Sequence, residues 1–336
     1  MPKLKFSLGL ILPLLLALAL PAGLGARLWL LDQRVASDGA EVAVEIPKGA
    51  GVMQVGELLV KAGVIRSAWG FALASRLTSL GPLKAGEYGL SPAMSQRMIL
   101  NHLARGKVLL HSVTIPEGFT LTQVVARLAE ARLLDPASAL ELARDPEFVA
   151  SLGLVGDSLE GYLFPDTYRL PRGLGAKAVL TILVRRFQAE WKALEPLAAQ
   201  RGLGQRRAVI LASIIEREAR VDQERPLISA VYHNRLKLGM KLQADPTVIY
   251  GLGDFEGNLT RVHLEKDHAY NTYTREGLPP GPICSPGLAS LKAALRPAAV
   301  DYLYFVAKGD GSHAFSRAYQ DQINNINRYQ RRRNGG

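Results

Sequence analysis

The sequence predicts an α+β protein with an N-terminal transmembrane helix, a small βα module and a mainly helical domain that ends in a β-hairpin. Three patterns predict this architecture. Residues 6–26 carry no charge, strand-like and helix-like segments alternate up to about residue 110, and amphipathic helical segments dominate from residue 120 to about 240. With 48% hydrophobic and 21% charged residues, the composition is that of a folded globular chain and excludes a disordered one.

The uncharged run at residues 6–26 is long enough to cross a membrane. As a helix it would span about 30 Å, the thickness of the hydrocarbon core of a bilayer. Lys3 and Lys5 precede it, so the positive-inside rule keeps residues 1–5 in the cytoplasm and exports the rest of the chain. We therefore expect a single-pass protein of the cell (inner) membrane, whose main part lies on the extracytoplasmic, or periplasmic, side.

The end of this run leaves one alternative open. Gly23 and Gly25 resemble the small residues of a signal-peptide cleavage site, so the segment would also suit a cleaved signal peptide. Residues 27–41 follow as a short polar linker.

Charge and cysteine content narrow the possible partners and cofactors. The 41 Lys and Arg residues exceed the 30 Asp and Glu residues and give a net charge of +11, which suits a polyanion such as nucleic acid, anionic lipid or a cell-wall polymer. Export of the chain excludes nucleic acid. Cys284 is the only cysteine, so no intrachain disulfide can form, and the spacing of the histidines is not that of a metal site. We expect no metal and no other cofactor.

A strand, a turn and a helix occur twice, 69 residues apart. The aligned residues are Ile46-Pro47 with Ile115-Pro116, Gly49 with Gly118, Gln54-Val55 with Gln123-Val124, Leu59 with Leu128, and Ala62 with Ala131. A match of this length without a gap predicts a duplicated β-α unit, in which each copy is too small to bury its own apolar face.

The first copy belongs to a small module. It is followed by a turn into a short strand at residues 83–90 and by a helix at residues 95–105. The size and βα alternation of residues 42–110 are those of a LysM-like carbohydrate-binding module, although small βα modules share this pattern without sharing function. We expect residues 111–336 to form the second domain, which closes with the hairpin at residues 302–316 and contains the candidate catalytic residue described next.

The helix at residues 207–218 carries the most informative acidic residue. Val209, Ala212 and Glu216 lie on one stripe, which we expect to face the core, so Glu216 would emerge among apolar neighbours. Glu218 lies about 200° further round the helix and is expected to point towards solvent. Poor solvation raises the pKa of a carboxyl group, as a general acid near neutral pH requires. The alternative is a glutamate that only pairs with an arginine at the helix end.

Several blocks of sequence carry a pattern that one protein family shares. The blocks are Glu160–Tyr162, Phe164–Tyr168, Ala212–Glu218, Asn234–Leu236, Gly239–Gly251, Tyr270–Tyr273, Gly277–Ile283 and Tyr302–Val306. Together they resemble the MltG (YceG-like) endolytic murein transglycosylase family. The resemblance covers nearly the whole chain, and several blocks in one order are far more specific than any single short motif.

The resemblance implies an enzyme, a peptidoglycan lytic transglycosylase with Glu216 as its catalytic acid. In such enzymes one acid protonates the glycosidic oxygen between N-acetylmuramic acid and N-acetylglucosamine. The resulting carboxylate takes a proton from the C6 hydroxyl, which closes a 1,6-anhydro ring. This nucleophile is internal, so no second carboxylate is required, unlike in ordinary glycosidases.

The resemblance also implies properties that the residues alone do not. It implies cleavage within peptidoglycan glycan strands, a role in limiting the length of nascent strands, and peptidoglycan synthases (penicillin-binding proteins) as partners.

Five further residues in these blocks are expected to bind substrate. The amides of Gln243 and Asn271 suit hydrogen bonds to acetamido and hydroxyl groups, and Tyr250 and Tyr273 offer flat faces to sugar rings. Asp245 would orient a neighbour or stabilise oxocarbenium-like charge, or else it would only cap the helix that follows it. Loop packing is the alternative role of Asn271 and Tyr273.

Two other functions stay open at this point. A hydrolase would use a second carboxylate, such as Glu218, Asp245 or Asp166, and would leave an end one water heavier than an anhydro end. A scaffold would bind the cell wall through residues 42–110 without cleaving it. The acid in its apolar stripe and the amide-bearing blocks favour the transglycosylase over both.

Overall fold

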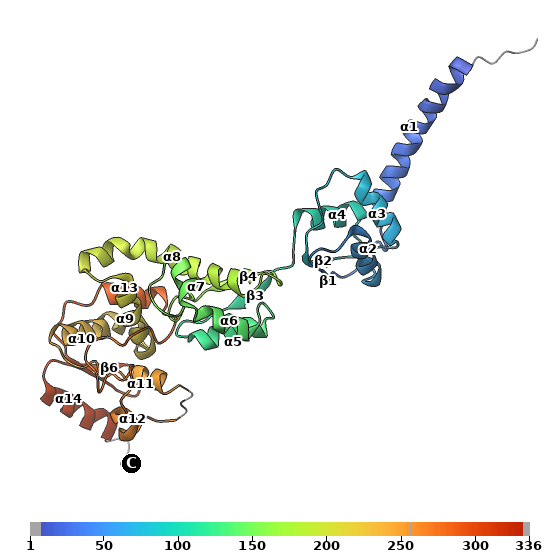
Figure 1. Ribbon diagram of the computed structural model, residues 1–336. Helices are drawn as coiled ribbons and strands as arrows, with labels where there is room; N and C mark the ends of the chain where they lie inside the picture. Colours follow the sequence, from blue (N-terminus) through green and yellow to red (C-terminus); the bar gives the residue numbers. More distant parts are fainter. Residues whose placement is uncertain (1–7, 254, 256, 332–336) are drawn as a thin grey trace, which may run out of the picture. The chain divides into compact units, whose positions relative to one another are not determined.

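The structure is a computed structural model that describes residues 8–253, 255 and 257–331 (Figure 1). It is a mixed α+β fold whose described strands form three two-stranded sheets. The chain divides into two compact units. Unit 1 comprises the residues up to His111 together with Pro171–Gly173, and unit 2 comprises Ser112–Leu170 and the chain from Leu174 onward.

Unit 1 is a small αβ module. Its elements are α1 (Leu8–Asp32), β1 (Val42–Ile46), α2 (Val52–Lys61), α3 (Ala68–Leu77), β2 (Gly86–Leu90) and α4 (Gln96–Arg105). Strands β1 and β2 pair antiparallel, with Val44 opposite Tyr88. Both side chains are buried in one apolar cluster with the helices, and Leu31 in the last turn of α1 belongs to the same cluster.

Helix α1 covers most of the segment for which we expected a membrane anchor. Residues 6 and 7 of that segment lie outside the described residues. Measured by length and hydropathy, no helix within the described residues qualifies as a membrane span. The predicted transmembrane helix is therefore not confirmed.

Unit 2 begins with a second αβ arrangement and continues with helices and a hairpin. The first part contains β3 (His111–Thr114), α5 (Leu121–Glu130), α6 (Pro136–Ala143), α7 (Pro146–Ser151), β4 (Thr167–Leu170) and α8 (Ala176–Arg201). The second part contains α9 (Gln205–Glu218), η1 (Asp222–Glu224), α10 (Arg225–Lys237), α11 (Asp245–Leu252), α12 (Arg261–Glu265), α13 (Leu288–Leu295), β5 (Tyr304–Ala307), β6 (His313–Ser316), α14 (Tyr319–Ile326) and the π-helical turn η2 (Asn327–Arg331).

Helix α9 is the centre of unit 2. Its eight consecutive residues from Ala208 to Ile215 are all buried, and α8, α10, α11 and α13 all contact it. Apolar residues occur on every face of this helix, so every face is covered, because an exposed face would leave apolar surface in water. The C-terminal end of α9 is therefore held in a fixed place.

The predicted repeat of strand, turn and helix is confirmed. Helix α2 starts and ends 69 residues before α5, and the turn glycines Gly49 and Gly118 adopt φ values of 80° and 77°. Only glycine adopts this left-handed conformation without strain. The likeness also extends further than the sequence indicated. Each copy continues with a second helix and a strand that pairs with the first, in the order β1-α2-α3-β2 and β3-α5-α6-β4, where α7 is an insertion.

Two other expectations agree with the structure. The region from 120 to 240 is mostly helical, with the short strand β4 between α7 and α8. The expected C-terminal hairpin is present as β5 and β6, with Phe305 opposite Phe315. Three short helices, α11, α12 and α13, lie between residues 245 and 295.

Matched leucines of the two copies test the division into units. Leu59 and Leu128 are fully buried at the same repeat position, so we expect Leu59→Ala and Leu128→Ala each to lower the free energy of unfolding by about 2–5 kcal/mol. Hydrogen exchange followed by mass spectrometry should localise the loss to unit 1 for Leu59→Ala and to unit 2 for Leu128→Ala.

The control is Val60→Ala, because this side chain is 39% exposed and should change the free energy of unfolding by less than about 0.5 kcal/mol. Loss of protection in both units from either leucine variant would contradict the division.

Candidate functional site

The C-terminal end of α9 and a proline-rich loop build the site. The Oγ of Ser213 accepts a hydrogen bond from the backbone N–H of Ile283 at 3.1 Å, and Cys284 Sγ donates to the carbonyl of Ser213 at 3.4 Å. These bonds fasten the loop to the helix. The lone cysteine therefore has a packing role, and burial raises the pKa of its thiol well above its ordinary value.

Glu216 is held in an ion pair at the end of this helix. Its Oε1 lies 3.2 Å from Arg225 Nη2, and its side chain is 7% exposed. Its Oε2 accepts a hydrogen bond of 2.9 Å from the backbone N–H of Gly287. The prediction that Glu216 emerges among apolar neighbours is wrong, because a buried guanidinium and a backbone donor occupy both of its oxygens.

Two further carboxylates lie near Arg225, one from Asp222 at 3.5 Å and one from Glu117. Glu117 Oε2 lies 4.0 Å from Arg225 Nη2. Burial and the nearby charge of Glu216 raise the pKa of Glu117. This group of charges ties the first turn of the second repeat to α9 and α10, which is a structural arrangement.

Glu218 lies in a different environment, and our expectation that it points towards solvent is wrong. It is only partly exposed, and its Oε1 accepts a hydrogen bond of 3.0 Å from Tyr232 Oη. Burial raises the pKa of Glu218 from its ordinary value of 4.5 to about 7, and the charge of Asp245 adds to this shift. Near neutral pH, this carboxyl group can therefore both give and take a proton.

Asp245 and Tyr273 lie next to Glu218. Tyr273 Oη donates a hydrogen bond of 2.6 Å to Asp245 Oδ1. Burial, followed by this bond, raises the pKa of Tyr273 far above its ordinary value, and the charge of Glu218 contributes as well. Asp245 is the first residue of α11, whose N-cap is Ala244 without a side-chain cap. The capping role that the sequence left open for Asp245 is therefore wrong.

Gln243 precedes this pair in a strained conformation. Its φ of 50° is one of two positive values among the described non-glycine residues, and such a conformation costs on the order of 1–2 kcal/mol. Its backbone N–H donates to Thr272 at 3.0 Å, and its Oε1 lies 3.4 Å from Arg235 Nη1. Strain of this kind is typical of residues whose position is needed for function.

Asn271 is a packing residue, in line with the alternative that the sequence left open. It is fully buried, and its Nδ2 donates to the carbonyls of Leu264 and Lys266 at 2.9 and 2.7 Å. Its Oδ1 accepts from the backbone N–H of Tyr273 at 2.8 Å. The amide of Asn271 is thus bonded within the protein, and its oxygen holds the backbone at Tyr273.

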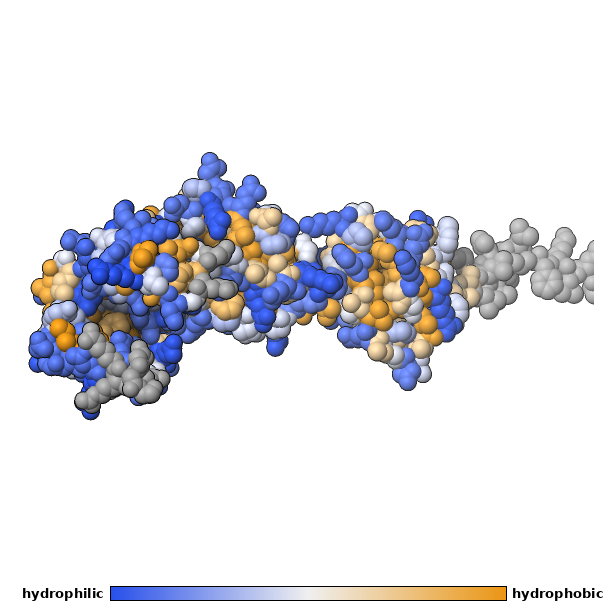
Figure 2. Space-filling view, turned by 90° about the horizontal axis from the view of Figure 1, so that it is seen from below, coloured by the Kyte–Doolittle hydropathy of each residue, from blue (hydrophilic) through white to orange (hydrophobic). Residues whose placement is uncertain are grey.

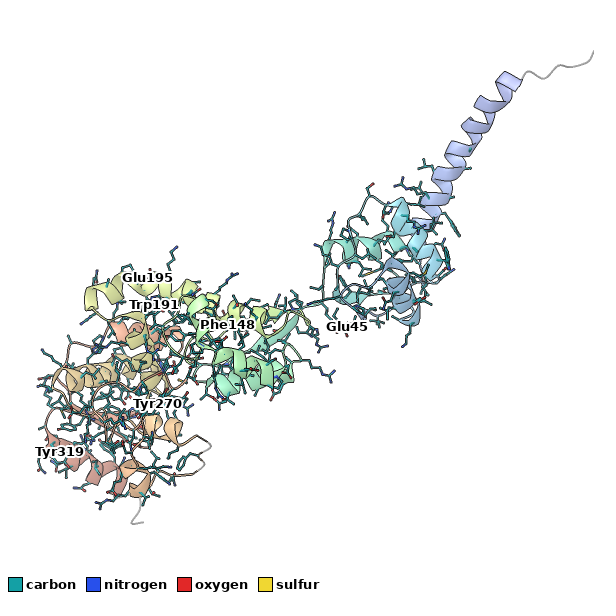
Figure 3. All side chains as sticks on the ribbon, in the orientation of Figure 1. Glu45, Phe148, Trp191, Glu195, Tyr270 and Tyr319 are labelled. Atoms are coloured by element: carbon teal, nitrogen blue, oxygen red, sulfur yellow. The ribbon has the colours of Figure 1, made fainter. Side chains whose placement is uncertain are left out.

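Tyr250 lies at the other end of α11, apart from Glu218. Its hydroxyl donates to Glu160 Oε2 at 3.0 Å, and its ring centroid lies 4.8 Å from that of Tyr270, which Figure 3 labels. Glu160 also accepts the backbone N–H of Leu121 with both oxygens, at 3.0 and 3.1 Å. Burial raises the pKa of Glu160 to about 7.

Sequence reasoning thus found the helix and the loops of the site, but not the different surroundings of the two glutamates at the helix end. The structure places Asp245 and Tyr273 near Glu218, Gln243 beside Arg235, and Tyr250 with Glu160. Tyr232 was missed, and its place one turn before Arg235 gave no distinguishing signal. Among the described residues, no three His, Cys, Asp or Glu side chains lie close enough together to hold a metal ion.

Comparison with known proteins gives a consistent result. Residues 44–328 match the model of the YceG-like family. The chain is 30% identical over 296 residues to an endolytic murein transglycosylase of Bacillus subtilis, which covers 83% of this chain and 82% of that protein. An endolytic murein transglycosylase of Streptococcus pneumoniae is 28% identical over 318 residues and 85% of this chain, but the chain spans only 58% of that protein.

A solved structure agrees with these sequence matches. The crystal structure of a YceG-like protein from Listeria monocytogenes has a TM-score of 0.59 and 34% sequence identity to this chain, and it covers 85% of this chain and 99% of its own.

The two glutamates at the end of α9 should have opposite effects on stability. Glu216→Gln removes one partner of a buried ion pair while Arg225 keeps Asp222 at 3.5 Å, so we expect a loss of about 1–3 kcal/mol, at the low end for such pairs. Glu218→Gln removes a carboxyl whose pKa is about 7 when folded against 4.5 ordinarily, and it should stabilise the protein at pH 8.

The sign for Glu218 follows from proton linkage. The unfolded chain releases this proton above about pH 4.5 and the folded chain only above about pH 7, so Glu218 lowers stability as the pH rises through that window. The gain from Glu218→Gln should be on the order of 1–3 kcal/mol at pH 8 and vanish at pH 4. Melting temperatures of both variants at the two pH values measure this. A Glu218→Gln variant less stable than wild type at pH 8 would contradict the assignment.

Proposed function

This chain belongs to the YceG-like family, and from that premise we propose that it is a peptidoglycan lytic transglycosylase, a carbon–oxygen lyase. It cleaves the glycosidic bond between N-acetylmuramic acid and N-acetylglucosamine and leaves 1,6-anhydro ends. The names of its Bacillus and Streptococcus relatives support the substrate and the endolytic mode of cleavage.

One observation carries the assignment of the acid. Glu218 is a partly buried carboxyl group with a pKa of about 7, and it lies near Asp245 and Tyr273 at the end of a fixed helix. A general acid works best with a pKa near the operating pH. Glu216 is less suited to donate a proton, because Arg225 and the Gly287 amide bind its two oxygens. We therefore assign the catalytic acid to Glu218 and a structural role to Glu216.

The reaction then needs a single acid in two steps. Protonated Glu218 donates its proton to the glycosidic oxygen, and the bond from that oxygen to C1 of N-acetylmuramic acid breaks. The C6 hydroxyl of the same sugar attacks C1, and the Glu218 carboxylate takes the proton that this hydroxyl loses. The proton count is balanced, and no water is consumed. The attacking group is part of the same ring, which supplies a high effective concentration.

The neighbours of Glu218 have supporting roles in these steps. Tyr232 donates to Glu218 Oε1 and fixes the direction of the carboxyl group. Asp245 carries the negative charge that stabilises an oxocarbenium-like transition state, and Tyr273 holds Asp245 in place. Gln243, in its strained conformation, offers its amide NH2 group to a hydroxyl or acetamido oxygen of the sugar.

A glycoside hydrolase is the second candidate function, because Asp245 is a second carboxylate near Glu218. In ordinary glycosidases the second carboxylate attacks the sugar or activates a water molecule. Asp245 already accepts a short bond from Tyr273, which favours a charge-stabilising role. A scaffold without catalysis has no use for a carboxyl group with a raised pKa at this position.

The paired glutamine variants test the assignment. Glu218→Gln keeps the shape and the acceptor for Tyr232 but cannot donate a proton, so cleavage of purified peptidoglycan should fall by at least about 100-fold. Glu216→Gln should keep most of its activity at a temperature where it is folded. Mass spectrometry of the glycan ends measures both the rate and the product.

Either of two results would reject parts of this proposal. Hydrolysed ends, one water heavier than anhydro ends, would replace the transglycosylase by the hydrolase. A fully active Glu218→Gln variant together with an inactive, well-folded Glu216→Gln variant would return the acid to Glu216.

We further propose that the N-terminal segment holds the enzyme in the cell membrane, with units 1 and 2 on the extracytoplasmic side. The uncharged run at residues 6–26 and the preceding Lys3 and Lys5 support this. Unit 1 exposes apolar surface (Figure 2), including Trp29 at 67% and Trp69 at 78%, and tryptophan is enriched at membrane interfaces. There the enzyme would limit the length of nascent strands beside peptidoglycan synthases, with unit 1 as a LysM-like module.

If residues 6–26 remain as an anchor, the native protein should sediment with membranes and resist extraction by high salt, because the attachment is apolar rather than electrostatic. Detergent should release it. A mature N-terminus near Ala26, measured by mass spectrometry of the purified protein, would identify the segment as a cleaved signal peptide instead.

A further inference from the structure

Unit 2 contains a cavity that the proposed chemistry at Glu218 does not use. Its volume is about 540 Å³, within the range of small-molecule sites. The first turn of α5, the connection between α6 and β4, helix α11 and the end of α9 line it. The lining includes Gln123, Arg144, Glu160, Arg217, Tyr250 and Phe255.

The cavity belongs to the second copy of the repeat. Thr122 and Gln123, in the first turn of α5, lie 69 residues after Met53 and Gln54 in the first turn of α2. Helix α11, which lies outside both copies of the repeat, also lines the cavity. The two cavities described for unit 1 lie instead against the last turn of α1.

The walls of the cavity combine flat apolar surface with hydrogen-bond donors. Tyr250 and Phe255 provide aromatic faces, and the Tyr250 hydroxyl is held by buried Glu160, which is 5% exposed. Arg144 and Arg217 provide guanidinium donors. Gln123 uses its Oε1 to accept the backbone N–H of Thr120 at 2.9 Å, which leaves its NH2 group for a ligand.

The cavity is close to the reacting carboxyl group. Asp245, beside Glu218, and Tyr250, in the cavity wall, are five residues apart on α11, about 7.5 Å along the helix axis. Arg217 in the cavity wall directly precedes Glu218. Adjacent rings of one glycan strand can span such a separation.

We propose that this cavity binds an N-acetylated sugar ring of the glycan strand next to the bond that is cleaved. The ring stacks on Tyr250, while the acetamido carbonyl and the hydroxyl groups accept hydrogen bonds from Gln123, Arg144 and Arg217. The second repeat is then the glycan-holding copy at the active site. This inference rests on the proposed function for the identity of the strand, but the binding itself can be measured without cleavage.

The repeat provides a matched pair of variants. Gln123→Glu keeps an acceptor for the Thr120 amide, because glutamate serves in a capping box as well as glutamine, but it replaces the NH2 donor by a carboxylate. Gln54→Glu makes the same change of charge at the same repeat position in unit 1. A second pair, Thr122→Trp and Met53→Trp, places a large ring at the mouth of the cavity or at the matching site on α2.

The experiment measures binding of a β-1,4-linked N-acetylglucosamine tetramer by isothermal titration calorimetry. All variants are made in full-length protein that carries Glu218→Gln. We expect Gln123→Glu and Thr122→Trp to raise the Kd at least about 10-fold, equivalent to about 1.4 kcal/mol. Gln54→Glu and Met53→Trp should stay within about 2-fold of the parent. Melting temperatures establish that each variant is folded.

The outcomes separate this inference from the proposed function. Unchanged Kd values for both folded cavity variants, equal weakening by the matched unit 1 variants, or no binding of the tetramer by the parent would each overturn the inference. If the cavity variants weaken binding but wild-type enzyme yields no anhydro ends, the sugar site stands and the proposed reaction fails.

Discussion

The burial of α9 is the constraint on which the rest of unit 2 depends. Eight successive residues of this helix are enclosed, and their removal from water is a large favourable term that is lost if the helix shifts. The helix end is therefore fixed, and two glutamates separated by one residue face different surroundings. Glu216 faces Arg225 and a backbone amide, while Glu218 faces tyrosines. One helix thus provides an ion pair that holds the loops and a carboxyl group that can exchange a proton.

The same constraint explains why sequence reasoning found the helix but not the surroundings of its two glutamates. Periodicity assigns a buried and an exposed face to a helix, so it predicted that Glu216 lies at the core stripe and Glu218 towards solvent. Because α9 is covered on all sides, the helical position of a glutamate does not determine its environment. The deciding contacts come from Arg225 and Tyr232, 9 and 14 residues further along the chain. No local pattern contains them.

Patterns that depend on neighbouring residues were predicted much better. The amphipathic helices, the hairpin and the repeat of β1-α2 in β3-α5 all follow from spacing within about fifteen residues or from direct alignment. The fate of Asn271 did not follow, because its amide is bonded to the carbonyls of Leu264 and Lys266 in a loop whose path is set by packing. The chemistry of the Asn271 amide suggested a contact with a ligand, but its NH2 group donates to two backbone carbonyls of the loop.

The second copy of the repeat makes contacts with the rest of unit 2 that the first copy has no residues for. Position 48 in the first copy is Lys, whereas the matching Glu117 in the second copy lies in the group of charges around Arg225. A Cβ atom at Gly287 would lie 1.8 Å from Glu117 Oε1, so any other residue at position 287 would force this carboxylate to shift. Arg217 Nη1 also donates to the carbonyl of Gly118 at 3.3 Å. The turn of the second copy therefore contacts both helix α9 and the proline-rich loop. Each of these contacts joins a residue of the second copy to a residue outside the repeat. Removing the second copy would therefore remove contacts that hold the end of α9, which carries Glu218.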